Sequence, residues 1–109
     1  MLEKNDQVRS IAGEFFRKAL EVYPVKKVLL YGSYAKGTAT EDSDLDLGVV
    51  LDMADHKLRI DISTGLFSIA RKIDIRIEPK CIFWDEFINC PPDSILSEII
   101  RTGVDVPSA

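Results

Sequence analysis

One stretch of the chain decides the fold: residues 29–50, with the sequence LLYGSYAKGTATEDSDLDLGVV. It starts inside an apolar strand predicted over 26–31, which ends at the turn pair Gly32-Ser33. A short helical turn and a polar loop follow, and the alternating run 44–51 then predicts a second strand. A strand, a tight turn that opens a helix, and a second strand with acidic residues at its start form the centre of the domain.

Apolar spacing and turn residues predict the elements on either side of this centre. These are a helix over 5–23, a helix over 55–71 with Asp55 near its start, a strand over 73–78, and a helix that opens at Pro92-Asp93 and stops at Gly103. Pro79 is expected to halt the third strand, and the segment with Phe83 and Trp84 to form a loop. The chain is therefore predicted to be one α+β domain over residues 1–109.

Length and composition narrow the functional classes. The chain has 109 residues, 46% of them hydrophobic, and 14 Lys and Arg against 18 Asp and Glu, a net charge of −4. This balance argues against a surface built for nucleic-acid phosphates, so no direct nucleic-acid binding is expected. Cys81 and Cys90 with a single His do not make a zinc site. Without an apolar run of about 20 residues or a signal-peptide core, a soluble, cytoplasmic protein is expected.

Three carboxylates are candidates for metal binding. Residues two apart on a strand share one face, so Asp44 and Asp46 project together while Leu45 faces the core. Asp74, on the predicted third strand, is expected to come beside this pair when the strands meet. Carboxylate oxygens that converge in this way suit Mg²⁺, which also binds waters and substrate phosphates.

The turn at Gly32-Ser33 is a candidate phosphate site. Glycine lets the backbone approach a ligand closely, Ser33 supplies a hydroxyl, and Lys36 adds a cation nearby. Phosphate on one side and metal carboxylates on the other indicate in-line displacement on a nucleoside triphosphate. A Walker A loop is excluded because Thr38 stands where its lysine would be, and no GxGxxG motif indicates a Rossmann site.

These residues resemble the signature of the DNA-polymerase-β-like nucleotidyltransferases, in which Gly-Ser is followed after a spacer by Asp-x-Asp. The segments that carry the resemblance are Leu30-Tyr31-Gly32-Ser33-Tyr34-Ala35-Lys36-Gly37 and, with a spacer of ten residues after Ser33, Ser43-Asp44-Leu45-Asp46-Leu47. The short length and the segment Lys72-Ile73-Asp74-Ile75 are similar to the minimal nucleotidyltransferases, which are antitoxin partners of HEPN-domain ribonuclease toxins.

The resemblance implies a fold, a reaction and a partner. The implied fold is a small mixed sheet packed by helices, and the implied activity is transfer of AMP from ATP to a Tyr hydroxyl of a HEPN toxin. Gly32 and Ser33 would hold the triphosphate, with Lys36 where Arg is frequent. The catalytic carboxylates Asp44, Asp46 and Asp74 would bind two Mg²⁺ ions, and Asp74 would act as the base or orient the metal.

Two other functions stay open. The chain could be a binding antitoxin that neutralises its partner by contact, with a vestigial or regulatory nucleotide site. Alternatively, two chains could assemble a complete enzyme that modifies a small molecule or an RNA end, and a homodimer of the free protein is also open. A domain of this size is too small to enclose a large substrate, so a partner is expected to complete the site.

Overall fold

The computed structural model describes residues 4–40 and 42–108. Its elements are α1 (Lys4–Leu20), β1 (Val25–Tyr31), α2 (Ser33–Lys36), β2 (Leu45–Leu51), the 3₁₀ helix η1 (His56–Leu58), α3 (Arg59–Arg71), β3 (Ile77–Phe83), α4 (Trp84–Ile88), α5 (Ile95–Thr102) and β4 (Val104–Asp105). The predicted α+β class and the order of its first five elements are confirmed. None of the helices described here is long and apolar enough to cross a membrane.

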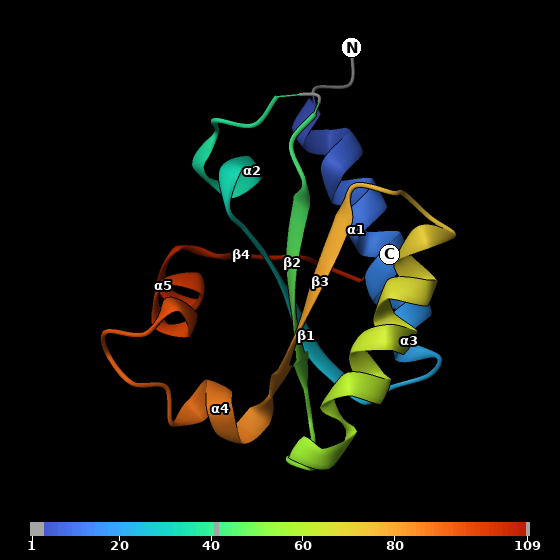
Figure 1. The fold of residues 1–109 in the computed structure, drawn as a ribbon. Coiled ribbons are helices and arrows are strands. Elements are labelled where there is room, and N and C mark those ends of the chain that lie inside the picture. The colour runs from blue at the N-terminus through green and yellow to red at the C-terminus, as the bar shows by residue number, and fades with distance from the viewer. Residues whose placement is uncertain (1–3, 41, 109) are drawn as a thin grey trace.

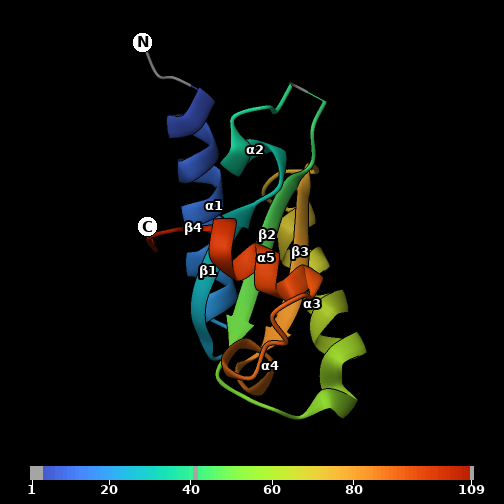
Figure 2. The same ribbon diagram turned by 90° about the vertical axis from the view of Figure 1, so that its left-hand side faces the viewer.

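The strands form one mixed sheet in the order β3-β2-β1-β4. β1 pairs antiparallel with β2 and with β4, whereas β2 and β3 are parallel. Helices α1 and α3 cover one face of the sheet, and α5 lies on the other, with α2 and α4 near opposite ends of the strands (Figures 1 and 2). The end of β1 and the starts of β2 and β3 therefore meet at one end of the sheet.

The main core lies between the sheet and the helices α1 and α3. Alternation along β2 sends Leu45, Leu47, Val49 and Leu51 into this core, and leaves Asp46 on the opposite face. On that opposite face, Gly48 lies against side chains of Ile82, Ile99 and Leu29, so a thinner apolar layer sits beneath α5. The carboxylate of Asp46 is thus held on the thinly covered face of a rigid central strand.

The predicted strand over 73–78 is wrong in its bounds. The backbone of Ile73 and Asp74 continues the last turn of α3, since both amides donate to the carbonyl of Ala70, at 3.0 and 2.9 Å. The strand begins at Ile77 and runs through Pro79 to Phe83. The alternation of apolar and polar residues indicated a strand here, but the amides of Ile73 and Asp74 are bonded to the end of the helix instead.

Pro79 does not stop β3 because β3 is an edge strand, and an edge residue whose amide would face away from the sheet loses no ladder bond. Other outward groups of the same edge are occupied by side chains. Arg71 donates to the carbonyl of Ile77 at 3.3 Å, Arg59 donates to the carbonyl of Cys81 at 2.9 Å, and Glu86 accepts from the amide of Phe83 at 2.9 Å. Three outward groups of the β3 edge are therefore already bonded, and Pro79 removes a fourth.

The segment expected to be a loop is ordered. Phe83 ends β3 with none of its surface exposed, as expected of a core residue. Trp84 begins the short helix α4, where its ring stacks on Phe87 with centroids 5.3 Å apart. The last helix starts at Ile95, capped by the Ser94 hydroxyl, and not at Pro92-Asp93.

Candidate active site

The turn after β1 is built around a glycine in a conformation that other residues avoid. Gly32 has φ 73° and ψ −150° and precedes α2, which is a single turn of four residues. A Cβ at this position would collide with the carboxylate oxygen Oδ2 of Asp46. Gly32 thus both permits the turn and lets it touch the acidic residue of β2. The fold thus brings Gly32 and Asp46, both predicted site residues, against one another.

The other predicted phosphate residues lie along the same turn. Ser33 is half-buried and opens α2, and its carbonyl accepts from the amide of Thr38 at 3.0 Å. Lys36 ends α2 and is exposed to solvent. Ser33 directly follows Gly32, the residue that lies against Asp46. The exposed Lys36 ammonium has the freedom to reach a bound anion.

Asp46 is the centre of the acidic cluster. It pairs across the sheet with Tyr31 on β1 and with Glu78 on β3. The pKa of Asp46 is raised, first by burial and then by the negative charges of Asp44 and Glu78. Three carboxylates that repel one another in this way define a place where a cation would be stabilised.

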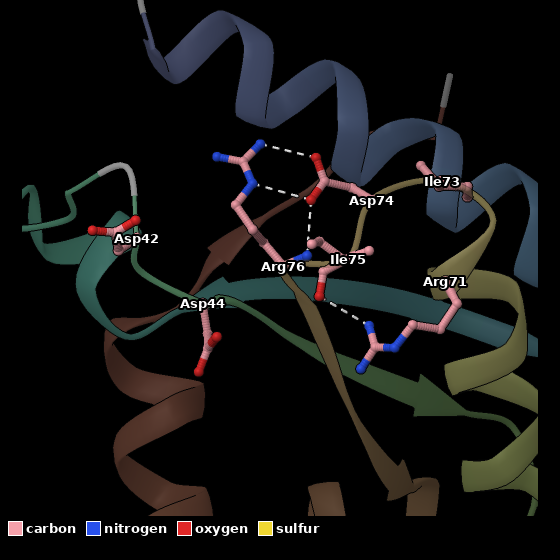
Figure 3. Close-up of a pocket in the computed structure, with 7 residues that line it drawn as sticks. All are labelled: Asp42, Asp44, Arg71, Ile73, Asp74, Ile75 and Arg76. Atoms are coloured by element: carbon pink, nitrogen blue, oxygen red, sulfur yellow. Dashed lines mark hydrogen bonds and ion pairs between the residues drawn. The ribbon is translucent and has the colours of Figure 1, made fainter.

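Glu78, and not Asp74, is the carboxylate that the sheet register sets opposite Asp46. Asp74 lies in the loop between α3 and β3 and forms a two-pronged ion pair with the guanidinium of Arg76, at 3.0 and 2.9 Å. Hydrogen bonds from Arg76 lower the pKa of Asp74. In Figure 3 the carboxylate of Asp44 points away from the Asp74–Arg76 pair. Asp74 and Asp44 line one open cavity of about 680 Å³, but the Asp74 carboxylate is paired with Arg76, and Asp46 lines the cavity beside Glu78.

Glu78 was visible in the sequence as part of the same alternating run as Asp74. Both residues share one face of an ideal strand, so the pattern could not choose between them. The choice is made by the register of β3 on β2, which sets Glu78 opposite Asp46. With a strand end predicted at Pro79, Glu78 was the last residue of the predicted strand and was not chosen as a site residue.

Sequence reasoning also missed two residues that line an open cavity of about 330 Å³ beside Asp46 and Glu78, namely Tyr31 and Lys80. Burial, and then the charges of Asp46 and Glu78, raise the pKa of Tyr31 to about 12. Its hydroxyl therefore stays protonated and able to donate a hydrogen bond. Lys80 adds an exposed cation on the side of the carboxylates away from the phosphate turn.

The acidic cluster does not form a finished metal cage. Among residues 4–40 and 42–108, no three Asp, Glu, His or Cys side chains are close enough to hold a metal ion by themselves. Mg²⁺ commonly binds through one or two carboxylates together with waters and substrate phosphates. The raised pKa of Asp46, and the turn that touches it, fit a metal ion that arrives with its nucleotide.

A mixed sheet that holds a glycine-serine turn against carboxylates on the neighbouring strands defines a protein of the nucleotidyl-transferring class. The comparison with family models agrees, since the model of the nucleotidyltransferase domain matches residues 12–101. The chain belongs to this nucleotidyltransferase family.

Two curated proteins of Methanocaldococcus jannaschii share part of the sequence, and each is named "Putative protein adenylyltransferase". One is 48% identical over 42 residues, which is 38% of this chain and 41% of the relative. The other is 37% identical over 46 residues, which is 42% of this chain and 46% of the relative. The match thus spans less than half the length of either curated relative.

Two solved structures share the fold. A nucleotidyltransferase structure from Sulfolobus solfataricus, described as putative, matches with a TM-score of 0.66 and 16% identity, covering 93% of this chain and 80% of that one. A toxin-antitoxin structure with AMP-PNP matches with a TM-score of 0.53 and 17% identity, covering 93% of this chain and 73% of that one. At these identities the likeness is one of fold.

Proposed function

We propose that the protein is a magnesium-dependent adenylyltransferase that moves AMP from ATP to a hydroxyl group of a partner protein. One observation carries this proposal: Gly32 of the phosphate turn lies against Asp46, whose pKa is raised by burial and then by the charges of Asp44 and Glu78. Triphosphate and metal carboxylates would thus be neighbours. The two curated relatives named as protein adenylyltransferases support a protein acceptor.

Each residue would have a distinct part in the reaction. Gly32, Ser33 and Lys36 would bind the β- and γ-phosphates, and Asp44, Asp46 and Glu78 would hold up to two Mg²⁺ ions. When bound, Mg²⁺ supplies charge neutralisation at the phosphate oxygens. Tyr31 would donate from its protonated hydroxyl toward the bound phosphates.

The reaction itself is a displacement at the α-phosphorus. The acceptor hydroxyl oxygen forms a bond to that phosphorus, the bond from the α-phosphorus to its bridging oxygen breaks, and pyrophosphate leaves with the bonding electrons. The proton of the hydroxyl passes to a carboxylate. Glu78 replaces Asp74 as the candidate base because it stands beside Asp46, whereas Asp74 is held by Arg76.

The acceptor would come from a second protein. The cavity beside Glu78 is open, so the described residues leave room for an incoming hydroxyl. We propose a HEPN-type toxin as the partner and a Tyr hydroxyl as the acceptor. The fold shared with the toxin-antitoxin structure that contains AMP-PNP supports a toxin as partner and a nucleotide as donor, and the HEPN type and the Tyr acceptor follow from the resemblance of the sequence motifs.

The test is transfer of label from ATP carrying ³²P at its α-phosphate, with Mg²⁺ and the protein encoded by the adjacent gene. Wild-type protein is expected to label the partner, and the double variant Asp44→Asn, Asp46→Asn is expected to lose the label. Asp93→Asn, which changes an exposed carboxylate outside the site, is the matched control and should retain it. Labelling of the partner that persists with the double variant would contradict the mechanism.

The same double variant separates catalysis from simple binding. If partner neutralisation also requires Asp44 and Asp46, AMP transfer is the means of inhibition. Neutralisation that survives in the double variant would instead establish a binding antitoxin. Transfer of label to RNA or to a small molecule, with the partner unlabelled, would move the acceptor class away from protein.

A further inference from the structure

The hydroxyl of Tyr34 joins separate parts of the chain. Tyr34 follows Ser33 on α2, and its ring packs against the main core. Nη1 of Arg76 donates to the Tyr34 hydroxyl at 3.2 Å, and the hydroxyl donates to the carbonyl of Thr40 at 3.3 Å. One oxygen atom thus bridges α2, the loop before β2 and the loop before β3.

Each bridged part carries a different component of the proposed site. Tyr34 is on the helix opened by the phosphate turn. Thr40 is tied to Ser43, since the Thr40 amide donates to the Ser43 hydroxyl at 2.9 Å and the Ser43 amide donates to the Thr40 carbonyl at 3.1 Å. Ser43 directly precedes Asp44, and Arg76 lies two residues before Glu78.

Arg76 is itself held in place from several sides. Asp74 accepts from Nε at 3.0 Å and from Nη2 at 2.9 Å (Figure 3). Nη1 is the nitrogen that donates to Tyr34. The Asp74 carboxylate also accepts from the Arg76 amide at 2.8 Å, and the Arg76 carbonyl accepts from the amide of Leu45 on β2 at 2.7 Å. A guanidinium fixed at both its fork and its backbone is a rigid anchor.

We infer that Tyr34 and Arg76 form a clamp that sets the spacing between the phosphate turn, Asp44 and Glu78. Arg76 lines the same open cavity as Asp44, but its guanidinium is bonded to Asp74 and Tyr34, so we assign both members as positioning residues and not catalytic ones. This inference rests on the proposed function, because it concerns how the metal and the nucleotide are held together. It gives Asp74 a role as the orienting partner of Arg76.

The clamp matters most when metal and nucleotide bind together. A metal ion shared by turn-bound phosphates and strand carboxylates requires a fixed distance between them, whereas the nucleotide alone requires only the turn. Small displacements of positioned groups reduce catalysis by up to about 10²-fold. Loosening the clamp is therefore expected to weaken the mutual support of Mg²⁺ and nucleotide and to leave metal-free nucleotide binding unchanged.

The test measures binding of AMP-PNP by calorimetry, with Mg²⁺ and with EDTA, in the full chain. In Tyr34→Phe the gain in affinity from Mg²⁺ is expected to fall about fivefold to tenfold, with the EDTA affinity unchanged. Tyr23→Phe, which also removes one tyrosine hydroxyl but lies outside the site, is the matched control. Arg76→Met should act in the same direction, and Arg76→Lys, which retains a donor but not the fork, should lie between.

The double variant Tyr34→Phe, Arg76→Met decides whether the two residues act as one device. The losses should not add, and the double variant should resemble the worse single variant. The clamp would be overturned if Tyr34→Phe and Arg76→Met kept the same gain in affinity from Mg²⁺ as Tyr23→Phe, or if their losses added fully in the double variant. Either result would leave the proposed function standing. Wild-type protein that does not bind Mg²⁺ and AMP-PNP would overturn both. If Tyr34→Phe does not fold, Arg76→Lys carries the measurement.

Discussion

Asp46 and Glu78 lie directly opposite one another on the parallel strands β2 and β3. This pairing brings a second carboxylate to the one that touches the glycine turn, and it makes Glu78 an alternative to Asp74 as the third acidic residue of the proposed site.

Replacing Glu78 and Asp74 in turn by their amides tests which of them is the third carboxylate of the active site. Glu78→Gln is expected to lower AMP transfer by roughly 10²-fold or more, as for loss of a general base. Asp74→Asn should cost no more than about tenfold, because it only loosens the orientation of Arg76. Initial rates at saturating ATP measure both, and a larger loss in Asp74→Asn would restore the assignment made from the sequence.

Two glycines with positive φ differ in ψ, which is −150° at Gly32 and 15° at Gly37, and in what a side chain would meet. Gly32 and Gly37 have φ of 73° and 77°, but only at Gly32 would a Cβ meet another residue within 4 Å, namely Asp46. Gly37→Ala is expected to lower the free energy of unfolding by about 1–2 kcal/mol with activity retained. Gly32→Ala should cost more and abolish transfer. Equal effects in denaturant titrations and rate assays would show that the contact with Asp46 is unimportant.

The raised pKa of Asp46 predicts a stability gain on its removal. A carboxylate with a folded pKa above its unfolded pKa destabilises the folded state once it is ionised, so its penalty grows as pH rises through that interval. At pH 7, metal-free Asp46→Asn is therefore expected to melt at a higher temperature than wild type. The difference should shrink when pH falls below the ordinary pKa of aspartate.

The reverse holds for Asp74, whose folded pKa is lowered by Arg76. Its contribution to stability is complete above the unfolded pKa and is lost as pH falls through the folded one. Asp74→Asn should thus melt below wild type at pH 7, and the two should converge in acid. Thermal melts of both variants across pH, without metal, check the opposite signs; shifts of the same sign would contradict the assignment.

The occupied edge of β3 predicts an effect of Arg59 on stability and solubility. Arg59 donates to the Cys81 carbonyl and pairs with Glu86, and its guanidinium lies over the ring of Phe83, 4.6 Å from the centroid. Arg59→Met is expected to cost about 1–2 kcal/mol, since the side chain is partly exposed. Light scattering should also rise, because a free strand edge invites pairing between molecules.

Arg101 provides the control for this change. It forms only a long ion pair with Glu98, at 3.9 Å, with both side chains largely exposed. Arg101→Met should leave both the denaturation midpoint and light scattering near those of wild type. Equal behaviour of the two variants would mean that the edge is not protected by Arg59.

The glycine turn after β1 and the acidic start of β2 could be predicted from the sequence, because both depend on local geometry, whereas their binding of phosphate and metal stays a prediction. Gly32 is required by its own backbone angles, and Asp44 and Asp46 share a face through alternation alone. The third carboxylate depends on where α3 ends and on the register of a parallel strand, which no local pattern records. Tyr31 and Lys80 became visible only when three strands were placed side by side.

The occupied edge of β3 also bears on how recognition can evolve. At this edge Arg59, Arg71 and Glu86 occupy three outward backbone groups and Pro79 lacks an amide hydrogen, which hinders a partner from adding its own strand. A complex formed on this side would then depend mainly on side-chain contacts. Such contacts discriminate between partners more strongly than main-chain pairing does. Substitutions at single surface positions could therefore retune the choice of partner without disturbing the strands that hold the carboxylates.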